Sequence, residues 1–377
     1  MEFLAGIWNY VVVFLLILTV VVFVHELGHF LVARWNGVKV EVFSIGFGPE
    51  VWGFNAKSGT RWRLSLLPLG GYVKMFGDAD AASTPDDRPM TEEEKAVAFH
   101  HKRVGQRAAI VFAGPAANFI FAIIGMSAMF MVLGQTVVEP VVGKVLEGSA
   151  AADAGLAPGD RIVAINGSRV DRFQDIQRIV MLEIEHPLNL AVQRGGGRFE
   201  VLAKPRIVER KSVFGEMQKV PILGIGADPA STRVVQHGVG SALLESLRET
   251  EAMVTSTFVG IGQMISGTRD TDQLGGPIRI AKGAGEAAQL GLSSVVYYTI
   301  LLSLNLGLIN LFPIPVLDGG HLLFYGFEAI LGRPLGERAQ EYGFRIGLFL
   351  VLALMVFATR NDIVSLPMWD ALVKLLS

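Results

Sequence analysis

Two histidines and a glutamate carry the strongest chemical signal in the chain. They lie in the run His25-Glu26-Leu27-Gly28-His29, which has the pattern H-E-x-x-H. On a helix, residues i and i+4 share a face one turn apart, so both imidazoles can reach a single zinc ion. Glu26 lies beside them and can take a proton from a zinc-bound water, which the metal acidifies. The pattern therefore predicts a hydrolytic zinc site.

The surroundings of this pattern strengthen the prediction, because it lies within a hydrophobic segment. Residues Ile7 to Val24 carry no charge, and the apolar character continues through Ala33. Ionisable groups inside a membrane are costly unless they pair with one another or bind a metal, so such a cluster indicates function. The alternative is a polar patch that only packs two helices together.

A catalytic zinc ion normally has three protein ligands and one open position, so another segment must supply the third ligand. The candidates lie in the run Asn310 to His321, which reads N-L-F-P-I-P-V-L-D-G-G-H. Pro313 and Pro315 cannot continue a regular helix, and unwound backbone at membrane depth is tolerated where it lines a protein cavity. Spacing alone leaves Asp318 and His321 as competing ligands, with Asp318 favoured.

The elements that must position these residues are membrane helices. Of the 377 residues, 51% are hydrophobic and 18% are charged, and the mean hydropathy is +0.45. A soluble domain carries about 25% charged residues. Four hydrophobic segments are long enough to span a bilayer: residues 7–33, 108–133, 292–317 and 342–359. A further uncharged stretch, 252–268, is rich in Thr, Ser and Gly and is expected at the membrane interface or along a cavity.

Composition excludes several classes of function. The formal net charge is -2, from 33 Lys+Arg against 35 Asp+Glu, so no overall basic field favours binding of nucleic acid. The chain has no cysteine, which excludes disulfides, a thiol nucleophile and a cysteine-ligated zinc site. A bound metal must therefore be held by His, Asp or Glu.

The distribution of positive charge predicts how the segments are oriented. The link from Trp35 to Arg107 is rich in Lys and Arg, whereas the ten N-terminal residues carry none. The positive-inside tendency places this link in the cytoplasm and residues 134–291 on the opposite side. The predicted active site then lies towards the cytoplasmic side of the membrane.

The segment on the outer side contains a small α+β pattern. Short apolar runs alternate with turn signals from Val141 to about Pro205, and the stretch Phe173 to Ile184 has the spacing of an amphipathic helix. The run G-L-x-P-G-D-x-I-x-x-I-N-G, from Gly155 to Gly167, resembles a PDZ domain, which binds extended peptides along a sheet edge. A spacer or steric gate that binds no peptide is the alternative.

The predicted fold class is a polytopic α-helical membrane protein with a β-hairpin and an inserted α+β PDZ-like domain. The expected parts are a first membrane half (1–133, with the hairpin within 40–75), a PDZ-like domain (138–205), a linker with interfacial helices (206–291) and a second membrane half (292–377). The hairpin strands are expected at Val40–Phe47 and Thr60–Leu67, separated by Gly48-Pro49 and a polar stretch. A final strand is expected after residue 205, before the linker.

Together these motifs resemble the site-2 protease family of zinc intramembrane metalloproteases. The resemblance is carried by H-E-L-G-H in the first span, N-L-F-P-I-P-V-L-D-G-G-H in a late span and the PDZ-like insertion between them. Further matching phrases start at Pro68 (P-L-G-G-Y-V-K-M), Phe112 (F-A-G-P-A-A-N-F) and Gly276 (G-P-I-R-I-A-K-G), so nearly the whole chain is covered. The single PDZ-like unit departs from the best-known enterobacterial members, which have two.

The resemblance implies a role for each site residue. His25, His29 and Asp318 would be zinc ligands, and Glu26 would be the catalytic acid and base. Asn310 would help to hold the substrate backbone. In the family the hairpin re-enters the membrane beside the zinc and offers a strand edge to the substrate; an ordinary surface hairpin is the alternative.

The expected function is zinc-dependent endoproteolysis within a bacterial inner membrane. The expected partners are the lipid bilayer and single-span membrane proteins, which at the level of the family include anti-sigma factors and remnant signal peptides. A transmembrane helix hides its peptide bonds in its own hydrogen bonds, so a substrate must unwind before attack. Two other classes compete: an inactive scaffold that binds partners through the PDZ-like unit, and a transporter whose His and Asp relay ions.

Overall fold

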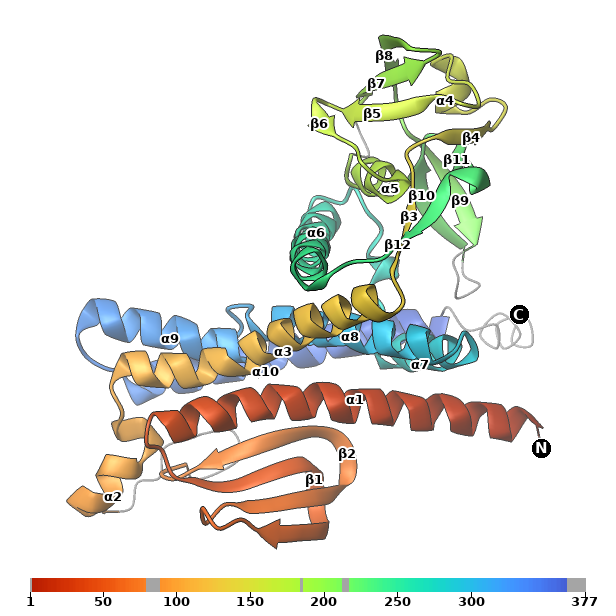
Figure 1. The fold of residues 1–377 in the computed structure, drawn as a ribbon. Coiled ribbons are helices and arrows are strands. Elements are labelled where there is room, and N and C mark those ends of the chain that lie inside the picture. Colours follow the sequence, from red (N-terminus) through yellow and green to blue (C-terminus); the bar gives the residue numbers. More distant parts are fainter. Residues whose placement is uncertain (1, 79–88, 184–185, 212–216, 365–377) are drawn as a thin grey trace, which may run out of the picture. The chain divides into compact units, whose positions relative to one another are not determined.

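The computed structural model describes residues 2–78, 89–183, 186–211 and 217–364 of the chain. The chain divides into two compact units. The first comprises Met1–Met126 with Gly275–Ser377, and the second comprises Ser127–Leu274. Figure 1 shows the elements coloured in chain order.

The first unit is built from helices, four of which are long and apolar enough to cross a membrane. Its helices are α1 (Glu2–Trp35), α2 (Glu92–Val97), α3 (Val104–Val132, which ends in the second unit), α7 (Pro277–Gln289), α8 (Leu292–Asn310), α9 (Asp318–Leu331) and α10 (Glu337–Val364). The four candidate spans lie in α1, α3, α8 and α10. The predicted number of spans is thus confirmed for the described part of the chain, and the protein is a multi-pass membrane protein.

The third span is shorter than the sequence predicts. Helix α8 ends at Asn310, whereas the uncharged stretch continues to residue 317. Residues 311–317 form turns, because Pro313 and Pro315 lack the backbone N–H that a helix requires. Hydropathy reports only that the segment is apolar, so it does not detect where the helix stops.

The β-hairpin is longer and more bent than predicted. Its strands are β1 (Val40–Asn55) and β2 (Arg61–Met75). Residues 42–45 pair with 61–64 on one side and with 71–74 on the other, so the two bent strands make four antiparallel rows (Figure 1). Gly48 has a φ of +87°, which glycine adopts without steric cost, so the chain bends at Gly48-Pro49 and does not turn there. Residues 71–75 consequently form one edge of the sheet.

Aromatic side chains attach the hairpin to α1. Phe43 stacks on Trp62 within the hairpin, with ring centroids 4.2 Å apart. Phe23 and Phe30 of α1 meet Phe43 edge-on, each with a centroid distance of 5.7 Å. Phe43 is fully buried, so this cluster fixes the hairpin along the second half of α1.

Helices α1 and α3 cross at a glycine. A Cβ added at Gly28 would lie 2.2 Å from the carbonyl oxygen of Ala113 and 2.7 Å from the Cβ of Ala117. Only the absence of a side chain allows this approach, as at other close helix crossings in membranes. The glycine within H-E-L-G-H therefore sets the distance between α1 and α3.

The second unit contains several small antiparallel sheets and two longer helices. One sheet has the order β6 (Ser168–Arg169), β5 (Arg161–Ile165), β7 (Leu188–Arg194) and β8 (Gly197–Ala203). Three further pairs join β3 (Gln135–Val138) with β12 (Thr232–Val235), β4 (Val142–Val145) with β11 (Ile225–Ala227), and β9 (Arg206–Lys211) with β10 (Met217–Ile222). The helices are α4 (Ala150–Asp153), α5 (Phe173–Leu182) and α6 (Val239–Ile265), and short 3₁₀ turns occupy Phe99–His101 in the first unit, Pro229–Ser231 and Thr271–Gln273.

The core of the second unit follows the alternation seen in the sequence. Helix α5 buries Phe173, Ile176 and Val180, which are spaced for one helical face. These side chains pack in a single cluster with inward-facing residues of the sheet, among them Ile162 and Leu190. The PDZ-like assignment itself remains a prediction.

The stretch after residue 205 contains more strands than predicted. The sequence predicts one final strand and a linker, whereas β9, β10, β11 and β12 all form there. Two of them pair with strands near the start of the unit, β11 with β4 and β12 with β3. Short strands of this kind are stabilised by distant partners, which local patterns in the sequence do not reveal.

We expect Gly28→Ala to destabilise the membrane unit. The added methyl group meets backbone of α3, so the helices must move apart, and overpacking of this kind costs about 1–3 kcal/mol. Thermal unfolding of the full-length protein in detergent measures the loss as a lower midpoint. Gly105→Ala on α3 is the matched control, because nothing lies within 4 Å of its added Cβ. An unchanged midpoint for Gly28→Ala would contradict the tight crossing.

The second unit contains a buried carboxylate whose loss should loosen it. Asp160 accepts hydrogen bonds from the Arg194 guanidinium at 2.6 and 2.8 Å and from the Ala157 N–H at 2.8 Å. The Arg194 hydrogen bonds hold the pKa of Asp160 below its usual value of 3.8. Because folding lowers this pKa, the stabilisation is fully present above pH 3.8 and is lost as the pH falls through the folded value.

We therefore expect Asp160→Asn to speed amide hydrogen exchange in β5 and β7 by about tenfold near neutral pH, because hydrogen bonds to a charged group are lost. Exchange followed by mass spectrometry on the whole protein makes the measurement. Asp171→Asn, which breaks an exposed ion pair with Arg169, should leave the same rates within about twofold. Equal effects of the two variants would argue against the proposed contribution of Asp160.

Candidate active site

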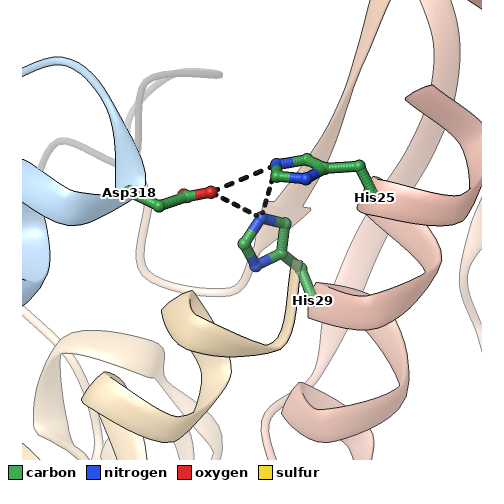
Figure 2. Close-up of side chains that lie close together, drawn as sticks. All are labelled: His25, His29 and Asp318. Carbon is green, nitrogen blue, oxygen red and sulfur yellow. Dashed lines mark hydrogen bonds and ion pairs between the residues drawn. The ribbon is translucent and has the colours of Figure 1, made fainter. Parts of the chain in front are cut away.

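Three potential metal ligands meet in the first unit (Figure 2). The Oδ2 atom of Asp318 lies 3.1 Å from Nε2 of His25 and 3.6 Å from Nε2 of His29. The two Nε2 atoms are 3.2 Å apart. Both imidazoles are buried, and each residue is only 8% exposed. Within the described part of the chain this is the one group of three such side chains that could hold a metal ion.

Helix α1 supplies the two histidines because its regular periodicity places positions 25 and 29 on one face. The third side chain arrives from the turns of residues 311–317, and Asp318 is the first residue of α9. Just before it, Val316 has a φ of +98°, a strained value for a β-branched residue. Strain of this kind persists only where the surrounding structure imposes it, and it clusters at functional sites.

The glycines after Asp318 allow the start of α9 to pack on this turn. A Cβ at Gly319 would lie 2.2 Å from the carbonyl oxygen of Phe312, and one at Gly320 would lie 2.4 Å from that of Ile314. Any side chain at either position would push α9 away from the turn. The D-G-G sequence thus joins a potential ligand, Asp318, to two residues without side chains, so α9 can begin close to the turn.

Helix α3 packs against the two histidines. The Nδ1 atom of His29 lies 2.9 Å from the carbonyl oxygen of Ile110, an acceptor, so this nitrogen carries a proton, and in the neutral ring Nε2 keeps a lone pair. A Cβ at Gly114 would lie 2.2 Å from His29 Nε2 and 2.9 Å from His25 Cε1. The imidazoles therefore fill the space that a side chain at position 114 would occupy.

The donor set fits a zinc ion. Ligand atoms of a tetrahedral zinc site, with bonds of about 2.0–2.1 Å, lie about 3.3–3.4 Å apart. The three separations observed are 3.1, 3.2 and 3.6 Å. Two imidazole nitrogens and a carboxylate oxygen are also ligands that zinc prefers. The Oδ2 atom of Asp318 is buried, and the contacts that the structure shows for it are those with the two imidazole nitrogens.

A cavity of about 760 Å³ opens beside this cluster. It is lined by Glu26, by Asn310 at the end of α8, and by Gly71, Tyr72 and Met75 from the edge of the hairpin. A Cβ at Gly71 would lie 3.1 Å from Cγ of Glu26, so the hairpin edge passes directly beside the glutamate. The structure thus brings Glu26 and Asn310 to the same cavity as the three potential ligands.

His321, the competing third ligand, lies in the same cavity but outside the cluster of three. Its ring packs near Phe344, with centroids 5.3 Å apart, and near Tyr325, at 6.5 Å. Burial lowers the pKa of His321, which favours a neutral ring at physiological pH. Of the two candidates for a third ligand, Asp318 lies within the cluster of three and His321 does not.

A second set of contacts holds α9 against α3. Arg107 of α3 forms an ion pair with Glu328 of α9, and its guanidinium lies 4.8 Å from the ring centroid of Tyr325. Burial raises the pKa of Tyr325 to about 12, so this side chain stays neutral. These contacts lie about two to three turns beyond Asp318 on the same helix and limit how far it can move.

Sequence reasoning missed the contribution of α3. Ile110, Gly114 and Asn118 lie beside the histidines, whereas in the sequence the phrase that contains the last two indicates only a family resemblance. The available signal was the spacing, because positions 110, 114 and 118 repeat every four residues and share one helical face. Backbone carbonyls and glycines carry no side-chain chemistry, so a search for catalytic residue types passes over them.

Comparisons with known proteins agree with this chemistry. Peptidase family M50 matches residues 13–354 of the chain. A protein from Agrobacterium fabrum named as a candidate zinc metalloprotease is 48% identical over 369 residues, which cover 97% of each chain. Metalloprotease MmpA of Caulobacter vibrioides is 39% identical over 374 residues, covering 93% of this chain and 94% of that protein.

The match spans both membrane halves and includes every residue of the cluster and its cavity named above. The family match and the four candidate spans together identify the class of protein. The chain belongs to peptidase family M50 and is a multi-pass membrane zinc metalloprotease.

Proposed function

We propose that His25, His29 and Asp318 hold the catalytic zinc ion and that Glu26 is the catalytic acid and base. The observation that supports this assignment most directly is the convergence of three ligand atoms from α1 and α9 at separations of 3.1–3.6 Å. Glu26 is the neighbouring carboxylate that lines the cavity without belonging to the cluster of three. A carboxylate in that position remains available for proton transfer.

When bound, zinc lowers the pKa of a coordinated water and polarises the scissile carbonyl. Glu26 accepts the proton that this water loses and later gives it to the departing amine, so one residue serves as base and then as acid. Asp318 contributes negative charge opposite the imidazoles, and the burial of both imidazoles strengthens the interaction of the cluster with a cation. Asn310 lines the cavity from the end of α8 and can donate its amide N–H groups to a substrate carbonyl.

We propose that the substrate is a segment of a single-span membrane protein bound in extended form. Residues 71–75 form an edge of the hairpin sheet, and all of them except Lys74 line the cavity beside Glu26. An unwound substrate exposes backbone N–H and C=O groups, and pairing with this edge would satisfy them. The proposal covers regulated intramembrane proteolysis of the type carried out by the bacterial enzyme RseP, with anti-sigma factors or remnant signal peptides as substrate classes.

The proposed orientation places the active site towards the cytoplasmic side of a bacterial inner membrane. The hairpin and the link that follows it carry most of the Lys and Arg residues between the first two spans. This excess favours the cytoplasmic side. His25 lies in the second half of α1, nearer to the hairpin than to the start of the helix, so the cluster falls on that side of the membrane.

We expect Glu26→Gln to keep about one zinc ion per chain and to lose cleavage of a single-span substrate by about 10²–10⁴-fold, because the amide keeps the shape of the side chain but cannot accept the proton. His25→Ala and His29→Ala should lose both zinc and activity, since two ligands hold zinc poorly. Metal content of the purified protein and cleavage in detergent micelles are the two measurements. Zinc loss from Glu26→Gln would show that Glu26 is a ligand and not the base.

A second pair of variants tests the third ligand. Asp318→Asn replaces a carboxylate with a weak neutral ligand, so zinc affinity should fall, and added zinc should restore binding better than activity. His321→Ala is the matched control on the same helix turn and should retain most of both. If His321→Ala stripped the metal while Asp318→Asn kept it, the proposed ligand set would be wrong.

The absence of cysteine makes the orientation easy to test. Ser58→Cys in the hairpin turn and Ser168→Cys in the second unit both introduce a thiol at an exposed position. In intact bacterial cells permeable only at the outer membrane, a membrane-impermeant maleimide should label position 168 and not position 58. Both should react after lysis. Labelling of position 58 in intact cells would reverse the proposed orientation.

A further inference from the structure

Asn118 is a fully buried polar residue next to the metal ligands, in the middle of α3. Its side-chain Nδ2 lies 3.2 Å from Nδ1 of His25. Its Oδ1 has no hydrogen-bond partner among the described residues. Burial of an unpaired amide oxygen costs free energy, so a buried asparagine in this state calls for an explanation.

The explanation follows from the chemistry of His25. This histidine presents Nε2 to Asp318 and His29, so Nε2 must keep its lone pair in order to bind a metal. A neutral imidazole then carries its proton on Nδ1, and that N–H requires an acceptor. A half-turn of the Asn118 amide exchanges Nδ2 for Oδ1 and supplies it. The same rotation pairs Oδ1 with His25 and moves Nδ2 to the place that Oδ1 occupied.

The other histidine shows the same arrangement with a fixed acceptor. His29 Nδ1 lies 2.9 Å from the carbonyl oxygen of Ile110, which can only accept. Ile110 and Asn118 are eight residues apart on α3, and Gly114 midway between them leaves room for both rings. One face of α3 therefore places a hydrogen-bonding group, the Ile110 carbonyl or the Asn118 amide, beside the Nδ1 atom of each imidazole.

The choice of an amide over a carboxylate also has a physical reason. Asp318 and Glu26 already supply two negative charges, which together balance the charge of one zinc ion. A third carboxylate at position 118 would leave a net negative charge among buried groups of a membrane helix bundle, where unbalanced charge is costly. A neutral oxygen orients His25 without adding charge.

We propose that Asn118 is a positioning residue that accepts the Nδ1 proton of His25 and thereby reserves Nε2 for zinc. The proposal rests on the proposed function, in which His25 is a zinc ligand. Outer hydrogen bonds of this type fix the tautomer and the ring orientation, and their loss lowers metal affinity by about 10–100-fold.

The test measures the zinc dissociation constant of the full-length protein in detergent, by competition with a chelator of known affinity. Asn118→Leu fills a similar volume but accepts no hydrogen bond, so zinc binding should weaken by about 10–100-fold. Asn118→Asp restores an acceptor and should bind zinc at least tenfold more tightly than the leucine variant. Ser303→Ala is the control, because its hydroxyl donates to the backbone oxygen of Asn118 at 3.2 Å and touches neither histidine.

The aspartate variant separates positioning from packing. If Asn118 only packs α3 against its neighbours, a buried charge should harm the protein at least as much as leucine does, and zinc affinity should not recover. That result would overturn the proposal, and so would wild-type affinity in the leucine variant. Should the leucine variant not fold, Asn118→Ala, which only removes atoms, takes its place with the same expectation. Absorption of cobalt in place of zinc gives an independent readout, because its spectrum should change in the leucine variant and return in the aspartate variant.

The variant His25→Ala distinguishes a failure of the Asn118 proposal from a failure of the proposed zinc ligand set. Loss of zinc in His25→Ala with normal affinity in Asn118→Leu would overturn only the role of Asn118. Retention of zinc in His25→Ala would instead contradict the ligand set itself.

Discussion

The structure depends on one electrostatic constraint: a carboxylate and two imidazoles face one another at 3.1–3.6 Å inside a helix bundle. When both imidazoles are neutral, all three groups present lone pairs and repel one another, and burial removes the water that would screen them. A divalent cation reverses the sign of this interaction. Two features of the neighbouring segments hold these three groups together.

Close approach of α1 and α3 is the first of these features. Gly28 brings the helices into backbone contact, and Gly114 leaves the space that the imidazoles fill. The cost is a crossing that tolerates no side chain, in a membrane where helices gain little hydrophobic energy from association. This approach places the Ile110 carbonyl and the Asn118 side chain of α3 beside the two histidines.

Backbone outside the helices is the second feature, and it contributes to the site in two places. The turns of residues 311–317 deliver Asp318 from the end of an apolar helix, and the bent hairpin places an unpaired strand edge beside Glu26. Backbone polar groups at membrane depth must be satisfied by protein or by a water-filled cavity. A cavity of about 760 Å³ that these segments share is therefore consistent with both the metal site and a place for an extended peptide.

The sequence by itself determined what is local: the H-E-x-x-H face, the four apolar spans and the break that Pro313 and Pro315 impose. Only the tertiary structure decided that Asp318 and not His321 meets the histidines, that α3 surrounds them, and that the stretch after residue 205 forms four strands. Periodicity, hydropathy and the effect of proline depend on residues close together in the chain, so they can be predicted from the sequence. Contacts between α1, α3 and α9 join segments far apart in the chain. They depend on packing distances that are set by Gly28, Gly114 and the turns of residues 311–317.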